Sequence, residues 1–487
     1  MDEVIRRLEG KVYINNEYID SQSSVYLTVT DPADGKVLTS KIPNASSEDL
    51  DLAVKSAEDA FQRSSPWRTM STAARRQCMW KLADLFNDPV HADMMSQLES
   101  HSFGRPIKPH LDVDVAVAVE GIRYYSGWCD KVTGETHLKD NGFTKSVRRE
   151  PIGVVGALLA WNGPIASVVM KAGPALATGN VIILKPSEKT PLGALYAADL
   201  FRQAGFPPGV FQVLPGDGKL GTLMASHMRI RKISFTGSIS TGKKVQEAAA
   251  KSNLKRVTLE LGGKSPVIVF EDADLDAAAF WAATAITANC GQYCIAGSRV
   301  YVQSEVYDAF LGRYTAILKQ MAGGKGIPSD PSTTYGPVAD KLQFERVQAY
   351  IESGKGEAKL VLGGDRMGDK GYFIHPTVFA DPTPNAKVYK EEIFGPVSVV
   401  KRFSTEEEVI ALANDTEFGL MAGVFTKQVD RAERMVSAIE SGTVCINSMM
   451  MVSAQTPFGG VKQSGYGSEG GFDSILAYTQ VKTVFLR

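Results

Sequence analysis

The sequence predicts an α/β fold: a doubly wound parallel sheet followed by a second α/β domain. The chain has 487 residues, enough for two large domains. From residue 152 onward, apolar strand-like runs alternate with helical stretches, which is typical of buried parallel strands. The alternation restarts after Gly262-Gly263 with Pro266–Phe270. The earlier runs are Gly153–Ala160, Val181–Leu184, Val210–Leu214, Lys232–Phe235 and Val257–Leu261.

The segment before this alternation is predicted to be mainly helical. Residues 46–63 form the clearest case, with Ser46 as a plausible N-cap. The apolar residues that recur there at helical spacing are Leu50, Ala53, Val54, Ala57, Ala60 and Phe61. Helical patterning continues to about residue 127.

Two extended pieces lie far apart in the sequence. Residues 131–150 contain the turn signals Thr133-Gly134 and Asn141-Gly142, and the last ten residues, YTQVKTVFLR, alternate like a strand. The two pieces could pair in one small sheet. Pattern alone leaves two interpretations open: an edge hairpin of the main domain, or an arm that reaches a neighbouring subunit.

Composition narrows the class of protein. The formal net charge of -1 gives no basic surplus for nucleic acid or an anionic membrane. We find no apolar run of about 18 residues and no signal-peptide core, so we expect a cytoplasmic protein without a membrane span. The odd cysteine count disfavours a disulfide framework, and the histidines are not at metal-ligand spacing, so we expect no metal site. The cysteines are Cys78, Cys129, Cys290, Cys294 and Cys445.

Two glycine-rich segments follow predicted strands. Residues 216–221 match G-x-G-x-x-G, which suits a dinucleotide site, although no acidic residue follows about 20 positions later. A tight structural turn and a phosphate contact are both compatible with it. Residues 237–244 nearly match a nucleotide-hydrolase phosphate loop, but Lys244 replaces the Ser or Thr that would hold magnesium. That segment still predicts an anion-binding helix N-terminus.

Three polar residues lie where chemistry is plausible. Cys294 follows the predicted helix 274–288 in a glycine-containing turn, although a cysteine is more often a buried apolar residue. Glu260 lies inside an apolar strand, where a carboxylate is either paired structurally or kept for chemistry. Asn162 ends a strand, as a turn residue or as a neutral donor to an oxyanion.

Taken together, these segments resemble the aldehyde dehydrogenase superfamily, in its NAD-dependent hydrolytic branch. The resemblance covers essentially the whole chain and depends on six motifs in the family's order. They are LELGGKSP (259–266), NCGQYCIAGSR (289–299), KPSEKTP (185–191), FTGSISTG (235–242), EEIFGPV (391–397) and TPFGGVKQSGYG (456–467).

The resemblance implies three structural parts. We expect an NAD-binding domain from residues 1–128 and 152–261, and a catalytic domain from residues 262–463. A small β oligomerisation arm would be formed by residues 129–151 and 475–487. Family members are usually dimers or tetramers, so a homo-oligomer is expected, with no nucleic acid or membrane partner.

The resemblance also assigns roles to residues of this sequence. Cys294 resembles the nucleophile and Glu260 the general base, while Asn162 and the backbone N–H of Cys294 resemble the oxyanion donors. Lys171 and Glu469 match a lysine near the active site and a carboxylate on the proton path. Lys185 and Glu188 match adenosine-ribose residues, Gly237 and Ser238 match the pyrophosphate contact, and Glu392 and Phe394 match residues at the nicotinamide end. Trp161, Ser187, Gly218, Phe235 and Leu261 complete the expected cofactor site.

The implied reaction is oxidation of an aldehyde to the carboxylic acid. A cysteine thiolate would form a thiohemiacetal, hydride would leave, and water activated by Glu260 would cleave the thioester. Glu188 would repel a 2′-phosphate, which favours NAD over NADP. The alternatives are an inactive binding or structural protein on the same scaffold and, remotely, a nucleotide hydrolase.

The expected substrate is a bulky hydrophobic aldehyde. Small or flexible residues stand where the family often has aromatic ones, which predicts a wide apolar tunnel. The predicted pocket consists of Gly163, Ser167, Met170, Tyr293, Ile295, Met451, Val452 and Phe458. The alternative is that the methionines at 449–451 only pack the core of their loop.

Overall fold

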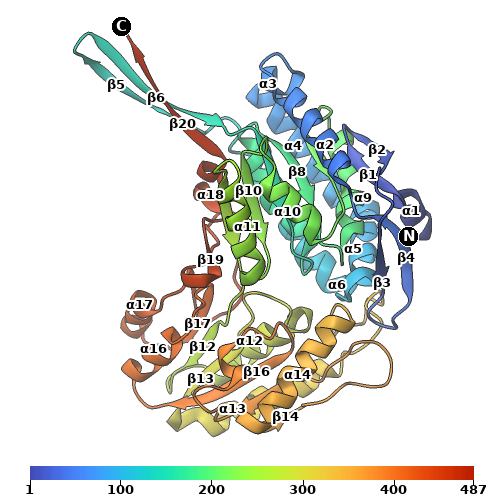
Figure 1. Ribbon diagram of the computed structural model, residues 1–487. Coiled ribbons are helices and arrows are strands. Elements are labelled where there is room, and N and C mark those ends of the chain that lie inside the picture. The colour runs from blue at the N-terminus through green and yellow to red at the C-terminus, as the bar shows by residue number, and fades with distance from the viewer.

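The structure is a computed structural model that describes residues 1–487, and it has the mixed α/β fold that the sequence predicts. Two large sheets lie one above the other in Figure 1, and a slender arm projects from the upper one. A separate two-stranded sheet pairs β3 (Tyr26–Thr30) with β4 (Val37–Pro43).

The first sheet has eight strands in the order β19-β11-β10-β7-β8-β9-β1-β2. Strands β7 to β11 are parallel, and successive strands run outward first from β7 toward β9 and then from β10 toward β11. The strand order therefore reverses between β7 and β10, where doubly wound sheets bind ligands. The bounds are β1 Lys11–Ile14, β2 Glu17–Asp20, β7 Val154–Leu158, β8 Val181–Lys185, β9 Phe211–Val213, β10 Lys232–Thr236, β11 Arg256–Glu260 and β19 Gly465–Tyr466.

Helices before, between and after these strands belong to the first sheet's part of the molecule. The predicted helix 46–63 is confirmed as α2 (Ser47–Phe61), and Ser46 and Asp49 cap its first turn reciprocally. The others are α1 Asp2–Leu8, α3 Pro66–Thr69, α4 Thr72–Asn87, α5 Pro89–Phe103, α6 Ile107–Pro109, α7 Ala116–Ser126, α8 Pro164–Ala177, α9 Pro191–Gln203, α10 Gly218–Ser226, α11 Ile239–Lys251 and α18 Gly471–Ala477. A π-helical turn, His110–Val115, joins α6 to α7.

The second sheet has seven strands in the order β14-β15-β16-β13-β12-β17-β18, and only β14 is antiparallel to its neighbour. Its strands are β12 Pro266–Val269, β13 Arg299–Gln303, β14 Lys359–Leu362, β15 Thr377–Ala380, β16 Val397–Phe403, β17 Met421–Phe425 and β18 Thr443–Ile446. Its helices are α12 Leu275–Thr287, α13 Tyr307–Ala322, α14 Lys341–Glu357, α15 Lys387–Lys390, α16 Glu406–Asn414 and α17 Val429–Ala438.

Each large sheet has its own apolar core. One cluster of buried residues surrounds the first sheet, and two further clusters lie on the two faces of the second. Along β12, Val267 and Val269 pack on one face while Ile268 packs on the other. We therefore propose the division of the chain near residues 261–262 as a domain boundary.

The two extended pieces pair as predicted. Strand β20 (Thr479–Leu486) lies antiparallel to β6 (Phe143–Pro151), which also pairs with β5 (Glu135–Asp140). This three-stranded sheet is separate from both large sheets and extends away from the body, with the C-terminus near its tip (Figure 1). The interpretation as an edge hairpin of the main domain is therefore wrong, because no strand of the arm joins the first sheet.

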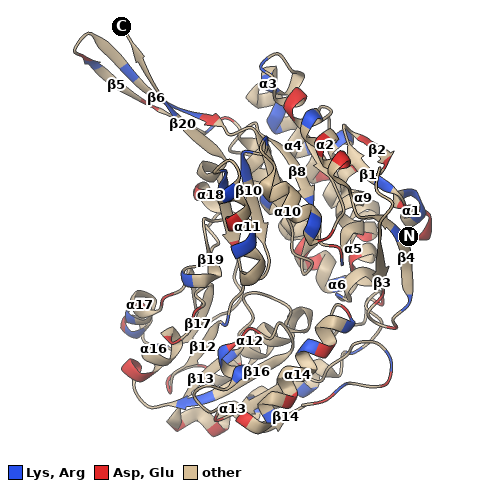
Figure 2. Cartoon of the chain, viewed as in Figure 1, with Lys and Arg blue, Asp and Glu red and all other residues tan.

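Charged side chains are spread over the molecule. Lys and Arg alternate with Asp and Glu on most of the visible elements, without one large region of a single sign (Figure 2). No helix combines the length and the apolar character that a membrane span requires.

Candidate active site

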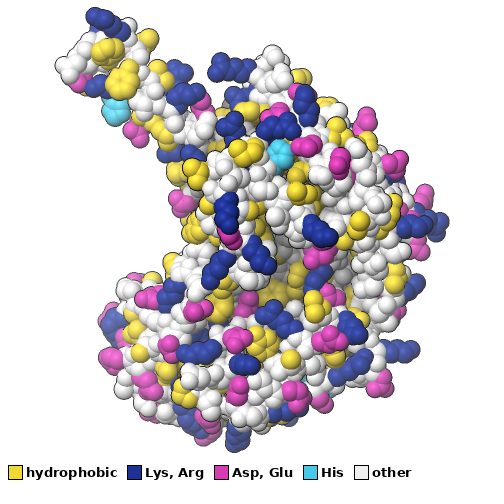
Figure 3. Space-filling view, viewed as in Figure 1, with side chains coloured by type: hydrophobic (Ala, Val, Ile, Leu, Met, Phe, Trp, Pro, Cys, Tyr) yellow, Lys and Arg dark blue, Asp and Glu magenta, His cyan; other side chains and the backbone are white.

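A cavity of about 590 Å³ opens at the carboxyl edge of the first sheet, between the two large sheets. The cavity begins where β7 and β10 end, which is where the strand order reverses. On its other side it is lined by residues from the α/β region that contains the second sheet. The space-filling view shows the hollow between the two lobes, with apolar side chains on its floor (Figure 3).

All the residues predicted to bind the cofactor line this cavity. They are Trp161, Lys185, Ser187, Glu188, Gly218, Phe235, Gly237, Ser238, Leu261, Glu392 and Phe394. Three of the five predicted catalytic residues, Cys294, Glu260 and Asn162, line it as well. The structure therefore brings residues separated by more than 200 positions in sequence around one space.

Two helix N-termini point into the cavity. Helix α11 begins after Ser238, whose hydroxyl accepts the N–H of Thr241, and α10 begins after Asp217, which accepts the N–H of Lys219. Both glycine-rich segments thus run into the first turns of these helices, and residues of both first turns line the cavity. Such termini present free N–H groups and the positive end of the helix dipole to an anion.

The glycines of residues 216–221 do different things. A Cβ at Gly216 would collide with Leu220, so that glycine allows a tight turn. A Cβ at Gly218 would meet no atom within 4 Å, because this glycine borders the open cavity. Gly216 therefore fits the structural interpretation of this motif, while the phosphate contact, for which Gly218 leaves space, stays a prediction.

The loop that carries Cys294 is irregular. Residues 288–291 form a single kinked turn after α12, with Asn289 and Cys290 at φ of 49° and 54°. Cys290 is buried, and its thiol donates to the hydroxyl of Tyr335 over 3.5 Å. Cys294, four residues later, is only half-buried and faces the cavity. One turn therefore separates a core cysteine from a cysteine that a ligand can reach.

The electrostatic surroundings of Cys294 disfavour its thiolate. Burial, together with the nearby carboxyl groups of Glu392 and Glu260, raises the pKa of the Cys294 thiol to about 12. The backbone N–H groups of Cys294 and Ile295 act in the opposite direction. The thiol is therefore protonated at neutral pH until a base or a change in the site removes the proton.

Glu260 is a buried carboxyl group without a partner. It ends β11, is 3 % exposed, and neither carboxyl oxygen has a hydrogen bond. Burial and the charge of Glu469 raise its pKa well above the usual range, and Lys171 partly opposes this. A raised pKa suits a carboxyl group that takes up and releases a proton near neutral pH.

Lys171 and Glu469 do not line the cavity, but both are close enough to Glu260 for their charges to shift its pKa. Lys171 in α8 is fully buried, and its ammonium group donates to Glu469 at 2.5 Å and to Ser234 Oγ at 3.0 Å. Glu469 is also fixed by backbone hydrogen bonds in both directions with Phe458. Together they place an ion pair next to an otherwise isolated acid.

Asn162 links the first sheet to the cysteine loop. Its amide nitrogen donates to the carbonyl of Gln292 over 3.0 Å, and its side-chain amide keeps a second hydrogen for another acceptor. Asn289 donates in turn to the backbone carbonyl of Asn162. The side chain is therefore held close to the loop that carries Cys294.

Two glycines after Glu260 allow the two halves of the chain to approach each other. A Cβ at Gly262 would collide with the carboxyl group of Glu392, and one at Gly263 would collide with the carbonyl of Cys294. The N–H of Gly263 also donates to Glu392 over 3.0 Å. Burial raises the pKa of Glu392.

At the other end of the cavity, Lys185 is buried and donates to the carbonyls of Pro186 and Gly216. Burial lowers its pKa. Glu188 is more exposed, with 46 % of its side chain accessible, and lies 3.9 Å from the Lys185 ammonium group.

None of the residues predicted for the substrate pocket lines this cavity. Tyr293, Phe458 and Ile295 pack on the core beside β12, Met451 and Val452 are exposed, and Gly163, Ser167 and Met170 are half-buried. Met449 is fully buried in that core, which agrees with the alternative that the loop methionines only pack the core. Met451 is exposed and does not agree with it.

Some cavity residues were not predicted. Gln343 and Arg346 belong to α14, which tertiary structure alone brings over the cavity. Lys189 lies inside the motif KPSEKTP (185–191), which could have indicated it. Its ammonium group lies 5.0 Å from the Trp161 ring centroid. Lys244 was considered only as a departure from a phosphate loop, yet it lines the same space.

The chain is similar to known proteins over nearly its whole length. A model of the aldehyde dehydrogenase family matches residues 18–484. The chain is 46% identical to "Aldehyde dehydrogenase, cytosolic 1" of Elephantulus edwardii, over 98% of this chain and 95% of that protein. It is 45% identical to "Aldehyde dehydrogenase, mitochondrial" of Rattus norvegicus, over 98% and 92%. Its fold matches the NAD+ complex of an aldehyde dehydrogenase from Bacillus cereus with a TM-score of 0.95, at 43% identity over 100% and 98% of the two chains.

Proposed function

This chain belongs to the aldehyde dehydrogenase family and oxidises aldehydes, and we propose that it does so with NAD through a thioester on Cys294. The observation that carries the proposal is that Cys294, Glu260 and Asn162 all line one cavity, into which both helix N-termini point. The product would be the carboxylic acid.

The cavity suits a dinucleotide. Its volume, the open space at Gly218 and the N-termini of α10 and α11 fit an extended ligand that contains a diphosphate. Lys185 and Glu188 would hold the adenosine ribose, and Glu392 and Phe394 the nicotinamide end. The carboxylate of Glu188 favours a free 2′-hydroxyl, hence NAD over NADP. When bound, NAD would supply the acceptor for the hydride that leaves the substrate.

The proposed chemistry at Cys294 begins with loss of its proton. The thiolate forms a bond to the aldehyde carbon and the carbonyl π electrons move to oxygen, which gives a thiohemiacetal anion. Asn162 Nδ2 and the backbone N–H of Cys294 would donate to this oxyanion. Collapse of the oxyanion as hydride leaves produces the thioester.

The proposed role of Glu260 is hydrolysis of that thioester. Its unpartnered carboxyl group removes a proton from water, the water oxygen attacks the acyl carbon, and the sulfur leaves and is reprotonated. The carboxylate of Glu469 would receive the proton next, and the Lys171 ammonium group, which donates to Glu469, would hold that carboxylate in place. A base with a raised pKa can pass the proton on near neutral pH.

The proposed substrate class is bulky and hydrophobic. A Cβ at Gly163 would have only one atom within 4 Å, Asp114 Oδ1, so this wall is open. Met451 and Val452 lie exposed after β18, available for apolar contact. A terpenoid or long-chain aldehyde should therefore have a higher kcat/KM than acetaldehyde, and a clear preference for acetaldehyde would contradict this part of the proposal.

We further propose that the chain forms a homodimer or homotetramer through its arm and acts in the cytosol. The arm buries few of its own side chains: Leu138 is 93 % exposed, and Phe485 and Leu486 are also exposed. The cytosolic name of a relative supports the location. Analytical ultracentrifugation with and without residues 479–487 tests the first of these points.

The experiment for the central proposal follows NADH absorbance with a panel of aldehydes. The wild-type chain should reduce NAD, and Cys294→Ala should lower turnover by at least about 10⁴-fold, because the covalent route is lost. Cys290→Ser is the matched control and should stay within about twofold, since its thiol is in the core. An inactive scaffold would give no NADH with any aldehyde, and an active Cys294→Ala would refute the covalent mechanism.

A further inference from the structure

A chain of buried polar side chains lies behind the first turn of α8. The Ser96 hydroxyl contacts His110 Nδ1 at 2.8 Å, and His110 Nε2 contacts Glu99 Oε2 at 2.5 Å. Ser, His and Glu in this order resemble a hydrolytic triad, but all three are sealed, with at most 1 % exposed. No substrate reaches this serine, so the cluster requires another explanation.

Glu99 caps a helix that belongs to the active site. Helix α8 begins at Pro164, which has no N–H, and its N-cap Gly163 has no side chain to accept a hydrogen bond. Glu99 Oε1, from α5, accepts the N–H of Ile165 at 2.9 Å instead. Its charge also lies at the positive end of the helix dipole. Asn162 directly precedes this capped turn.

A second buried pair reaches the other side of the same site. Arg105 Nη2 lies 2.5 Å from Asp114 Oδ2, and both side chains are more than nine-tenths buried. A Cβ at Gly163 would lie 4.0 Å from Asp114 Oδ1. The Arg105 guanidinium lies 5.4 Å from the ring centroid of Tyr293. Tyr293 directly precedes Cys294.

The two pairs belong to one unit. His110 and Asp114 both lie in the π-helical turn His110–Val115, and such turns are often found at functional sites. Through Glu99 the turn supports the residues after Asn162, and through Arg105 it supports the residue before Cys294. Asn162 and Cys294, next to these supported residues, carry the two groups proposed above to donate to the oxyanion.

We propose that Glu99, His110, Arg105 and Asp114 are positioning residues that hold the two oxyanion donors in register from behind. The proposal rests on the proposed function, because it assumes that Asn162 and the N–H of Cys294 face the reacting oxygen. None of the four lines the cofactor cavity, so their effect should fall on the chemical step rather than on binding of NAD.

The test is a double-mutant cycle. His110→Leu leaves Glu99 buried with one unpaired oxygen and should lower kcat by roughly 10- to 100-fold, the cost of a small displacement of catalytic groups. The KM for NAD should change by less than about twofold, since the cavity is intact. In an Asn162→Ala background the same substitution should cost less than about threefold, because the donor it positions is already absent. His110→Gln, which keeps a donor toward Glu99, should restore most of the activity.

The matched control is His101→Leu. His101 lies on the same helix α5 and pairs with Asp31 at 2.6 Å, but it has no hydrogen bond to α8 or the cysteine loop. It should leave kcat within about twofold. An equal loss from His110→Leu with and without Asn162, or an equal loss from His101→Leu, would overturn the proposal.

A second substitution, Arg105→Lys, and a parallel assay of Cys294→Ala cover the cases in which the first cycle gives no answer. If His110→Leu does not fold, as judged by loss of NAD binding, the cycle is run with Arg105→Lys, which keeps the charge beside Asp114 but not the planar fork. Equal losses in both backgrounds would again overturn the proposal. Cys294→Ala, assayed in parallel, tests the covalent mechanism alone, so failure of the proposed function is distinguishable from failure of the positioning role.

Discussion

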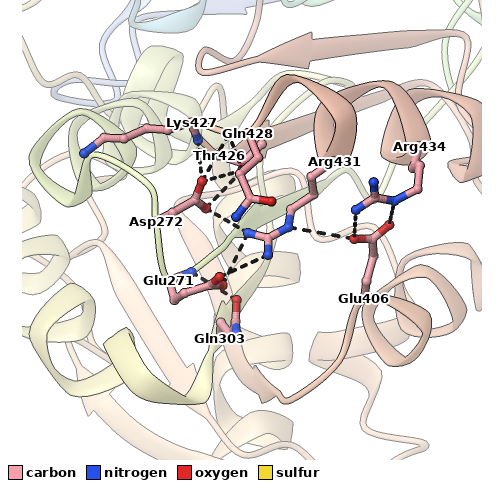
Figure 4. Close-up of polar contacts among 9 residues, drawn as sticks. All are labelled: Glu271, Asp272, Gln303, Glu406, Thr426, Lys427, Gln428, Arg431 and Arg434. Atoms are coloured by element: carbon pink, nitrogen blue, oxygen red, sulfur yellow. Dashed lines mark hydrogen bonds and ion pairs between the residues drawn. The ribbon is translucent and has the colours of Figure 1, made fainter.

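The charged cluster around Arg431 and the buried acid Glu260 differ in whether their charged groups have partners. Around Arg431, which α17 contributes, the charges are paired: the guanidinium contacts Glu271 at 3.0 Å and Asp272 at 2.9 Å, and it also faces Glu406 (Figure 4). Asp272 further accepts the N–H groups of Lys427 and Gln428. Glu260, in contrast, is buried with both oxygens unpartnered.

The difference separates stability from chemistry. Each carboxylate around Arg431 faces its guanidinium group, so this cluster ties the end of β12 to α16 and α17 at a lower electrostatic cost than unpaired charges would have. An unpaired carboxyl group destabilises the fold, and a fold tolerates it only where it is protonated or used. The contrast predicts that changes at Glu260 alter turnover, whereas changes at Arg431 alter stability.

The largest effect is expected from Glu260→Gln. Because glutamine cannot accept the proton of the hydrolytic water, steady-state turnover should fall by about 10²–10⁴-fold. A rapid burst of NADH, near one equivalent per active site, should precede the slow phase, since hydride transfer does not need this base. Stopped-flow absorbance measures both phases. Loss of the burst together with turnover would mean that Glu260 acts before hydride transfer, and the comparison would then need revision.

A smaller effect is expected on the reactivity of Cys294. A carboxylate beside a thiol disfavours the thiolate, so removing it in Glu260→Gln should lower the pKa of Cys294 from its value of about 12. The rate of alkylation by iodoacetamide should rise with pH up to at least pH 10 in the wild-type chain. At pH 9 the variant should react several-fold faster, because more of its thiol is ionised. A slower variant would instead identify Glu260 as the base that takes the thiol's proton.

The smallest effect on turnover is expected at Arg431. Arg431→Met leaves Glu271 and Asp272 without their cation, so the protein should lose about 1–3 kcal/mol of stability. Activity per folded molecule should stay within about twofold. The control is Arg434→Met, which removes an exposed guanidinium paired only with Glu406 and should leave the denaturation temperature nearly unchanged. Thermal denaturation and initial rates measure both; a large loss of turnover in Arg431→Met would remove the distinction between the two groups.

Local sequence patterns were enough to predict most parallel strands of the first sheet and the candidate catalytic residues Cys294 and Glu260. Strands that are buried on both faces are continuous apolar runs, and the runs that correspond to β7, β8, β10 and β11 can therefore be recognised in the sequence. Cys294 and Glu260 were conspicuous because each breaks a local rule, one as a thiol in a glycine-rich turn and the other as a charge in an apolar strand. The predicted residues that line the cavity lie in motifs, which are local in sequence.

Which residues line the same cavity depends on long-range packing, which local sequence patterns do not encode. Helix α14 carries Gln343 and Arg346 over the cavity from a distant part of the chain, and no local pattern announces this. Met449 and Met451 are two residues apart, yet one is core and the other exposed, since a loop has no fixed period. The His110 and Arg105 pairs depend on α5, the π-helical turn and α8 meeting, and long-range packing alone sets that meeting.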